Sequence, residues 1–311
     1  MMIETRFTTV GSITVTGQSR GKMNLSDLNQ SRERAFCEAF NIPYPYVPPE
    51  PDYSPRRDER KILVLSDPHE PYGAEYVYRE ALRTDHDAGL VVIPGDMGDY
   101  YSKPRFRKTK PGSFRDEVRA VFYRMEWLSV HWPAVKIMLG NHDNRPEKKI
   151  QNLLDADPEL LIFTEANLLK HLACYFHNVD IVEHQIVNKG MGLTYVWQFG
   201  DMIFTHAEIS RAQDTATMEF ISNWLHTWKG MLGLKPYRFI GQGHNHRNLL
   251  TGRDGETWMM FPTCSDPYSL GMEYIWQRMY RKPPAVGYSV LYHDEGVCSP
   301  NECHNIVLRS Q

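Results

Sequence analysis

The sequence has few cysteines, and none of them form a C-x-x-C pair. Cys37, Cys174, Cys264, Cys298 and Cys303 are an odd number at irregular spacing. That pattern argues against a secreted disulfide framework and against a thiolate-rich structural zinc module. The cysteines are therefore expected to be reduced thiols.

Long apolar runs are also missing. No stretch approaches the roughly 18 consecutive apolar residues of a membrane span. The N-terminal segment MMIETRFTTVGS lacks the basic stretch and apolar run of a secretory signal. These absences predict a soluble protein with no membrane partner and a cytoplasmic location.

Charge of either sign is nearly balanced, with a formal net charge of −3. A balanced chain has no global attraction for nucleic acid, so any anion binding must come from local features. Of the 311 residues, 41% are hydrophobic and 23% are charged, which is ordinary globular usage. The chain is long enough for one large domain or two modest ones, with a sizeable core.

Proline is concentrated in residues 43–55, PYPYVPPEPDYSP. Each proline fixes φ and lacks a backbone donor, so neither a helix nor a sheet continues through this segment. We predict a small N-terminal extension over residues 1–42, a proline-rich linker over residues 43–60, and the main domain over residues 61–311.

The N-terminal extension is too short to fold alone. It contains a β-like stretch, RFTTVGSITVTG, and a helical one, LSDLNQSRERAFCEAF, in which Leu28, Ala35, Phe36 and Ala39 fall on one face. A helix beside a turn could belong to a DNA-reading module. A packing extension is the favoured interpretation.

From residue 61 onward, apolar runs end in polar clusters. The runs are KILVLSDPH, LVVIPGDMGD, VKIMLGNHD, DMIFTHAE and YRFIGQGHNH. Aliphatic and β-branched runs bounded by Gly, Pro or Asp are typical of buried strands, and the stretches between the first three suit helices. Apolar residues recur at helical spacing in 116–130 and 218–228, which predicts helices there. Trp224 and Trp228 in the second stretch are interpreted as core residues rather than as a substrate-binding surface. The sequence predicts an α/β fold.

Ligands of α/β sheets gather at the carboxyl ends of the strands, where all five polar clusters lie. The clusters supply Asp67, His69, Asp96, Asp99, Asn141, His142, Asp143, His206, His244 and His246. Carboxylate, imidazole and amide donors suit manganese, iron or zinc. Each cluster alone is weak, since a single histidine such as His206 is more often structural. Their conjunction predicts a metal site, because buried polar groups are costly unless they are paired or metal-bound.

These motifs closely resemble those of the calcineurin-like metallophosphoesterase superfamily: D-x-H, GDxxD, GNH followed by an acid, a single His, and G-H-x-H. The match spans about residues 61 to 247. The resemblance implies a four-layer α/β sandwich of two mixed β-sheets flanked by helices, with two divalent metal ions. It assigns Asp67, His69 and His246 to the first ion, Asn141, His206 and His244 to the second, and Asp96 to both. One departure is that His206 lies in THAE rather than beside a glycine.

A two-metal site hydrolyses phosphoesters by clamping the phosphate and activating a bridging hydroxide as the nucleophile. His142 is the expected general acid, and Asp143 is expected to orient it. Asp99 is expected to support a metal-ligand histidine from behind. Arg145 is expected either to reach a phosphate oxygen or to form a surface salt bridge.

A basic segment, YYSKPRFRKTKPGSFR, follows GDMGD and includes Lys103, Arg105 and Arg107. Two interpretations remain open: a rim that attracts a polyanion, with Tyr100, Tyr101 or Phe106 stacking on a base, or an ordinary solvated loop. The region after GHNH is similar, more loosely, to phosphoesterases of phage and bacterial type. It favours nucleic acid or nucleotides as substrates.

The leading prediction is a metal-dependent phosphodiesterase or nuclease. The alternatives are a phosphomonoesterase, including a protein phosphatase, and a non-catalytic metal-binding scaffold. The sequence leaves the native metal and the oligomeric state open. A last motif, CSPNECHN, brings Cys298, Cys303 and His304 together; an exposed turn is favoured over a zinc site because no fourth ligand is evident.

Overall fold

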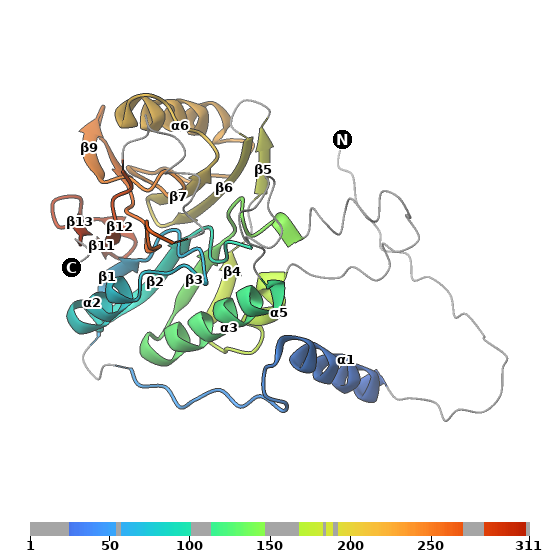
Figure 1. The fold of residues 1–311 in the computed structure, drawn as a ribbon. Helices are drawn as coiled ribbons and strands as arrows, with labels where there is room; N and C mark the ends of the chain where they lie inside the picture. Colours follow the sequence, from blue (N-terminus) through green and yellow to red (C-terminus); the bar gives the residue numbers. More distant parts are fainter. Residues whose placement is uncertain are drawn as a thin grey trace.

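The computed structural model describes residues 25–53, 57–100, 113–146, 168–182, 185–188, 192–269 and 283–308. Within these ranges the chain is an α/β protein built on two mixed sheets (Figure 1). The β-like stretch at residues 6–17 and the basic residues Lys103, Arg105 and Arg107 lie outside the described residues.

The first sheet contains the strands that lead into the first three polar clusters. Its order is β12-β11-β1-β2-β3-β4, and β13 also pairs with β11. Strands β1 to β4 run parallel to one another, with β4 at one edge of the sheet, whereas β11 is antiparallel to β1. The strands are β1 (Asp58–Val64), β2 (Ala88–Pro94), β3 (Val135–Met138), β4 (Val179–Val182), β11 (Gly287–Asp294), β12 (Val297–Cys298) and β13 (His304–Val307).

The second sheet contains the strands that lead into the last two polar clusters. Its order is β5-β6-β7-β8-β10-β9, with β7, β8 and β10 parallel and β5, β6 and β9 paired antiparallel. The strands are β5 (Gln185–Asn188), β6 (Gly192–Phe199), β7 (Met202–Ala207), β8 (Phe239–Gln242), β9 (Leu249–Arg253) and β10 (Glu256–Met260).

Helices cover the outer faces of both sheets (Figure 1). The helices are α1 (Leu25–Phe40), α2 (Glu75–Asp85), α3 (Phe114–His131), α5 (Leu168–Ala173) and α6 (Asp214–Trp228). Of the helices formed by the described residues, none combines the length and the apolarity needed to cross a membrane. The α/β sandwich of two mixed sheets flanked by helices is therefore confirmed.

Alternating side chains along the second sheet divide the core into two layers. In β7, Phe204 belongs to the core shared with the first sheet, while Ile203 packs in the cluster with α6. In β8, Phe239 and Ile240 divide in the same way. This alternation follows from the two-residue period of a strand, and it buries both faces of the sheet.

The N-terminal helix α1 packs against α3. The prediction that Ala35 and Ala39 belong to the packing face of this helix is wrong, because both residues are exposed. The buried residue is Cys37, and Phe36 and Phe40 pack against the same core. Strand β1 begins at Asp58, inside the segment predicted as linker. The division of the chain at residues 42 and 60 stays a prediction.

Candidate metal centre

Five of the predicted ligands have left-handed backbone conformations. The positive φ values are 51° for Asp67, 52° for His69, 53° for Asp96, 65° for His244 and 53° for His246. Such conformations cost roughly 1–3 kcal/mol each for residues other than glycine, and they cluster at functional sites. The strand ends therefore turn sharply at these residues, and their side chains point into one shared region.

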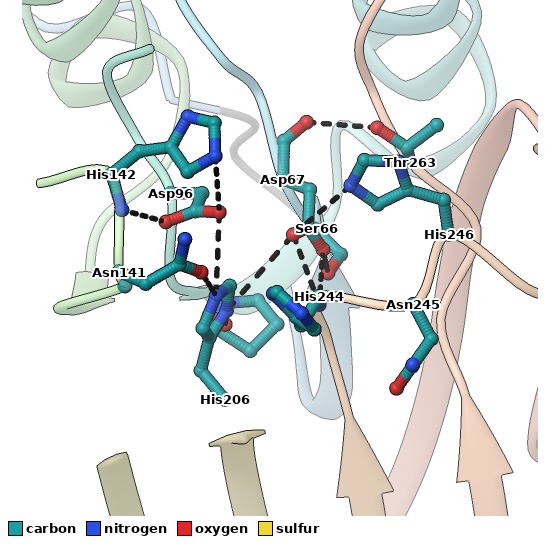
Figure 2. Close-up of polar contacts among 12 residues, drawn as sticks. Ser66, Asp67, Asp96, Asn141, His142, His206, His244, Asn245, His246 and Thr263 are labelled. Atoms are coloured by element: carbon teal, nitrogen blue, oxygen red, sulfur yellow. Dashed lines mark hydrogen bonds and ion pairs between the residues drawn. The ribbon is translucent and has the colours of Figure 1, made fainter. Parts of the chain in front are cut away.

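The first ligand group joins the end of β1 to the loop after β8 (Figure 2). The Nε2 atoms of His69 and His246 lie 3.3 Å apart. Nε2 of His246 is also 3.3 Å from Oδ1 of Asp67. All three side chains are buried, and their donor atoms are close enough to share one ion. This is the trio that the sequence predicted for the first metal.

The second ligand group joins the ends of β2, β3, β7 and β8. Nε2 of His206 lies 3.3 Å from Oδ2 of Asp96 and 3.1 Å from Oδ1 of Asn141. Asp96, His206 and His244 also place donor atoms within reach of a single ion. These four residues are the predicted ligands of the second metal.

Asp96 lies between the two groups. Its Oδ2 atom is 3.3 Å from Nε2 of His206 and 3.8 Å from Nε2 of His69. Its Oδ1 atom accepts a hydrogen bond of 2.8 Å from the backbone N–H of His142. Asp96 is therefore placed to serve both groups, as the predicted bridging ligand must.

The donor set fits divalent metal ions. Asp67, His69, Asp96 and His206 are at most 1% exposed, so bare carboxylates and imidazoles converge away from water. Such a convergence is costly unless the groups are paired or coordinate a cation. Nitrogen and oxygen donors without thiolate suit manganese, iron or zinc.

Gly140 allows the loop after β3 to approach this cluster. A Cβ atom at Gly140 would lie 2.1 Å from Oδ1 of Asp96 and 2.3 Å from its backbone nitrogen. Both atoms belong to Asp96, the predicted bridging ligand, which is buried. Only glycine fits at this position, and the loop can therefore bring Asn141 and His142 beside Asp96.

His206 is held in a single ring orientation. Its Nδ1 donates to the carbonyl oxygen of Pro94 at 2.8 Å, which leaves Nε2 facing the second ligand group. Burial disfavours the charged imidazole, but the carboxylates of Asp96 and Asp67 outweigh it and raise the pKa of His206 to about 10. By contrast, burial and the nearby His206 lower the pKa of His244 to about 3.

The raised pKa of His206 predicts a pH-dependent stability of the metal-free protein. Because folding raises this pKa from 6.5 to about 10, the charged ring stabilises the fold fully below pH 6.5. The contribution disappears as the pH rises through 10. In thermal melts of metal-free protein, the deficit of His206→Asn relative to the wild type should shrink between about pH 6 and pH 10. A deficit that grows with pH would contradict this assignment.

His142 is oriented by Asp99. Nδ1 of His142 lies 2.7 Å from Oδ1 of Asp99, and the same carboxylate oxygen lies 3.1 Å from Nδ1 of His69. One buried carboxylate therefore holds a predicted ligand and the predicted general acid together. Asp99 was expected to support a ligand histidine, and its contact with His69 agrees with that expectation.

The expectation that Asp143 orients His142 is wrong. The carboxylate of Asp143 accepts hydrogen bonds from the backbone N–H groups of Met97, Gly98 and Gly140. Asp143 therefore joins the GDMGD loop to the GNHD loop. Burial and the nearby Asp96 raise its pKa to about 7, against the backbone donors that lower it.

Arg145 contacts His142 rather than forming a surface salt bridge. Its Nη2 donates to Nε2 of His142 at 2.9 Å, and its Nη1 donates to the carbonyl oxygen of Asp99 at 2.6 Å. Burial and this guanidinium lower the pKa of His142. The neutral ring thus donates from Nδ1 and accepts at Nε2.

One predicted substrate contact is wrong. Tyr100 is fully buried, and its ring lies 6.0 Å from that of Phe114. It packs in the core and cannot stack on a base. Tyr101 and Phe106 lie outside the described residues.

A buried amide, Gln242, was not predicted from the sequence, and it joins β7 to the GHNH loop. Its Nε2 donates to the carbonyl oxygen of Ala207 at 3.0 Å and to Oδ1 of Asn245 at 3.1 Å. Its Oε1 accepts from Thr205 and from the backbone N–H of Ala207. Asn245 points away from the ligands (Figure 2) and donates to the carbonyl oxygen of Ile209. This network fixes the spacing of the histidines on both strand ends.

Gln242→Leu should weaken metal binding by about tenfold to a hundredfold, as the loss of a ligand-supporting contact typically does. The substitution removes the hydrogen bonds that Gln242 makes with Thr205, Ala207 and Asn245, and with them the polar link between β7 and the GHNH loop. A competition titration against a metal-sensitive dye measures the affinity. Gln213→Leu, at an exposed position before α6, should bind metal as the wild type does. Wild-type affinity in a folded Gln242→Leu protein would show that the network does not position the ligands.

The described residues thus define an α/β protein with two mixed sheets and a buried cluster of histidine and carboxylate donors where the sheets meet. No family model matches the sequence, and no curated protein matches it. The fold of this chain is similar to that of several solved structures. The metallophosphoesterase from Sphaerobacter thermophilus is 15% identical, with 81% of this chain and 90% of that chain covered and a TM-score of 0.36.

Two further structures are similar at the same level. A novel archaeal phosphodiesterase is 14% identical, with 80% of this chain and 99% of that chain covered and a TM-score of 0.36. Wild-type Vps29 from Entamoeba histolytica, complexed with Zn²⁺, is 11% identical, with 79% and 98% covered and a TM-score of 0.37. Sequence identities and TM-scores this low do not assign the chain to a family, so the function must be argued from the site itself.

Proposed function

We propose that this chain is a metal-dependent hydrolase of phosphoester bonds with two divalent ions, and that it prefers phosphodiesters. The observation that supports this most is the position of Asp96. Its Oδ2 atom lies within reach of both donor groups, 3.3 Å from Nε2 of His206 and 3.8 Å from Nε2 of His69. Sharing one carboxylate between two groups is the arrangement that a two-metal phosphoesterase needs.

Asp67, His69 and His246 would hold one ion, and Asn141, His206 and His244 the other, with Asp96 common to both. Manganese, iron and zinc all accept these donors. When bound, the two ions would polarise a phosphoryl oxygen and make water nucleophilic at neutral pH.

His142 would protonate the leaving oxygen. Its Nε2 lies 4.0 Å from Oδ2 of Asp96, so the ring edge faces the ligand groups. Asp99 holds Nδ1 and stabilises the protonated ring before it gives up its proton. In this structure Nε2 accepts from Arg145, so that contact must open before His142 can donate. The freed guanidinium would then be available to a phosphate oxygen.

The preference for diesters, with nucleic acid or nucleotides as the substrate class, is proposed from the basic segment that follows GDMGD. The lysines and arginines of that segment would attract a polyanion. The metal ligands alone do not choose between diester and monoester, because both reactions use the same charge stabilisation.

The direct test is hydrolysis of bis-p-nitrophenyl phosphate against p-nitrophenyl phosphate by metal-stripped protein that has been reloaded with manganese. Faster diester turnover is expected, and a single-stranded oligonucleotide is the next substrate. Preference for the monoester would make the protein a phosphomonoesterase. Stoichiometric metal binding without turnover of any of these substrates would instead indicate a metal-binding scaffold.

A further inference from the structure

Cys298 and Cys303 form a pair of buried thiols at one edge of the first sheet, remote in sequence from every metal ligand. Their Sγ atoms lie 3.7 Å apart. The two residues are 8% and 3% exposed, just beneath a surface where Val297 is 51% exposed. The other three cysteines are single: Cys37 and Cys264 are buried, and Cys174 is exposed.

The backbone brings the two sulfurs together. The segment from 299 to 303 reverses direction, with Glu302 N–H bonded to the Ser299 carbonyl at 3.0 Å and Cys303 N–H to the Pro300 carbonyl at 3.3 Å. β12 and β13, on either side of this turn, both pair with β11. The sheet therefore fixes both ends of the turn, and the cysteines stay close without a covalent bond.

A zinc site does not form here among the described residues. His304, the third member of the sequence motif, is exposed, and its Nδ1 lies 2.8 Å from the Glu302 carbonyl oxygen. No group of three potential ligands in the described part of the chain includes either cysteine. Structural zinc requires four ligands, so two sulfurs alone do not hold it.

We propose that Cys298 and Cys303 are a modification site at which a low-molecular-weight disulfide, of the class of oxidised glutathione, forms a reversible protein disulfide. To reach the S–S bond length of about 2.05 Å, the two sulfurs must approach by roughly 1.6 Å. The turn between them is held by backbone hydrogen bonds from Ser299 to Tyr292, from Glu302 to Ser299 and from Cys303 to Pro300, and these must adjust to the shift. The proposal does not depend on the metal centre.

The reaction is a pair of thiol–disulfide exchanges. The sulfur of Cys303 attacks one sulfur of the small disulfide, breaks its S–S bond and releases one small thiol. The sulfur of Cys298 then attacks Sγ of Cys303, which releases the second small thiol and closes the protein disulfide. Two cysteine thiols are oxidised, one small disulfide is reduced, and the two cysteine protons end on the released thiols. The hydrogen bond from Cys298 lowers the pKa of Cys303, in keeping with Cys303 as the first nucleophile.

The disulfide would tighten a contact between the two sheets. The backbone N–H of Cys298 donates to Oδ1 of Asp201 at 2.8 Å, and the N–H of Asp201 donates to the Gly296 carbonyl at 2.9 Å. Asp201 lies in the turn between β6 and β7. The oxidised protein should therefore melt at a higher temperature than the reduced protein, because the crosslink restricts the unfolded chain.

The test equilibrates the full-length protein with glutathione buffers of increasing oxidation, quenches with acid, alkylates free thiols, and analyses tryptic peptides by mass. Cleavage after Arg281 and Arg309 leaves both cysteines in one peptide. We expect this peptide to become unalkylated and lighter by two hydrogen atoms, reversibly on reduction, with the melting temperature rising in parallel. Cys174→Ser should behave as the wild type, and Cys298→Ser should lose the redox-dependent melting shift.

Three results would overturn the proposal. Both cysteines could remain alkylatable in the most oxidising buffer. A stable mixed disulfide with glutathione could accumulate on Cys303 in the wild type. Zinc alone could protect both cysteines from alkylation at one ion per chain, which would make them metal ligands instead.

Discussion

Asp96→Asn should reduce phosphodiester turnover by about a thousandfold or more, equivalent to about 4 kcal/mol of transition-state stabilisation. Asparagine has the same shape, and its Oδ1 can still accept the hydrogen bond from His142 N–H. It removes the negative charge between His206 and His69 and places an amide donor there. Two cations would then lose their common anionic ligand, so the metal content per chain should fall together with turnover.

The measurement combines elemental analysis of the purified variant with bis-p-nitrophenyl phosphate hydrolysis. Asp254→Asn is the matched control, because the side chain of Asp254 is 90% exposed on the turn between β9 and β10. It should retain full metal content and full turnover. If Asp96→Asn kept two tightly bound ions, Asp96 would not be a ligand common to both groups.

His142→Ala should leave metal binding intact and reduce turnover by about 10²-fold to 10⁴-fold. His142 is adjacent to the predicted ligand Asn141, but its own ring is held by Asp99 and Arg145. Loss of the ring removes the proton donor without removing any of the seven proposed ligands. The effect should therefore appear in kcat, with the metal content unchanged.

The nature of the leaving group makes this test specific. p-Nitrophenolate departs without protonation, so a diester with an alkoxide leaving group should lose far more rate in His142→Ala than bis-p-nitrophenyl phosphate does. His177→Ala, at an exposed position between α5 and β4, should change neither rate. Equal losses for both leaving groups would count against a general acid and in favour of a metal-positioning role.

The sequence was sufficient to predict the fold class, because the strands that matter are buried on both faces. The runs ending at Asp67, Asp96 and Asn141 became β1, β2 and β3, and those ending at His206 and His244 became β7 and β8. Continuous aliphatic runs of that kind leave little alternative to a covered sheet. The face of α1 was harder to predict, because its pattern offers Cys37 and two alanines as equally plausible core residues, and only tertiary packing distinguishes them.

The predicted ligands lie together because each is near the carboxyl end of a strand: His206 is within β7, and the others are in the loops that follow β1, β2, β3 and β8. The supporting contacts were less predictable. Asp143 is next to His142 in sequence, yet a left-handed turn at Asp96 and the close approach at Gly140 direct the Asp143 carboxylate to backbone N–H groups. Asp99 holds His142 from a different strand end. Gln242 precedes GHNH in an ordinary strand, and no pattern in the sequence distinguishes its amide from a surface one.

Each proposed ion draws ligands from both sheets. Asp67 and His69 come from the first sheet and His246 from the second; Asp96 and Asn141 face His206 and His244 in the same way. A motion that separates the sheets would therefore split both coordination spheres at once, whereas fraying at the edge of either sheet would leave them intact. The geometry of the site therefore depends on the relative position of the two sheets. Substitutions far from any ligand can consequently impair it by shifting one sheet against the other.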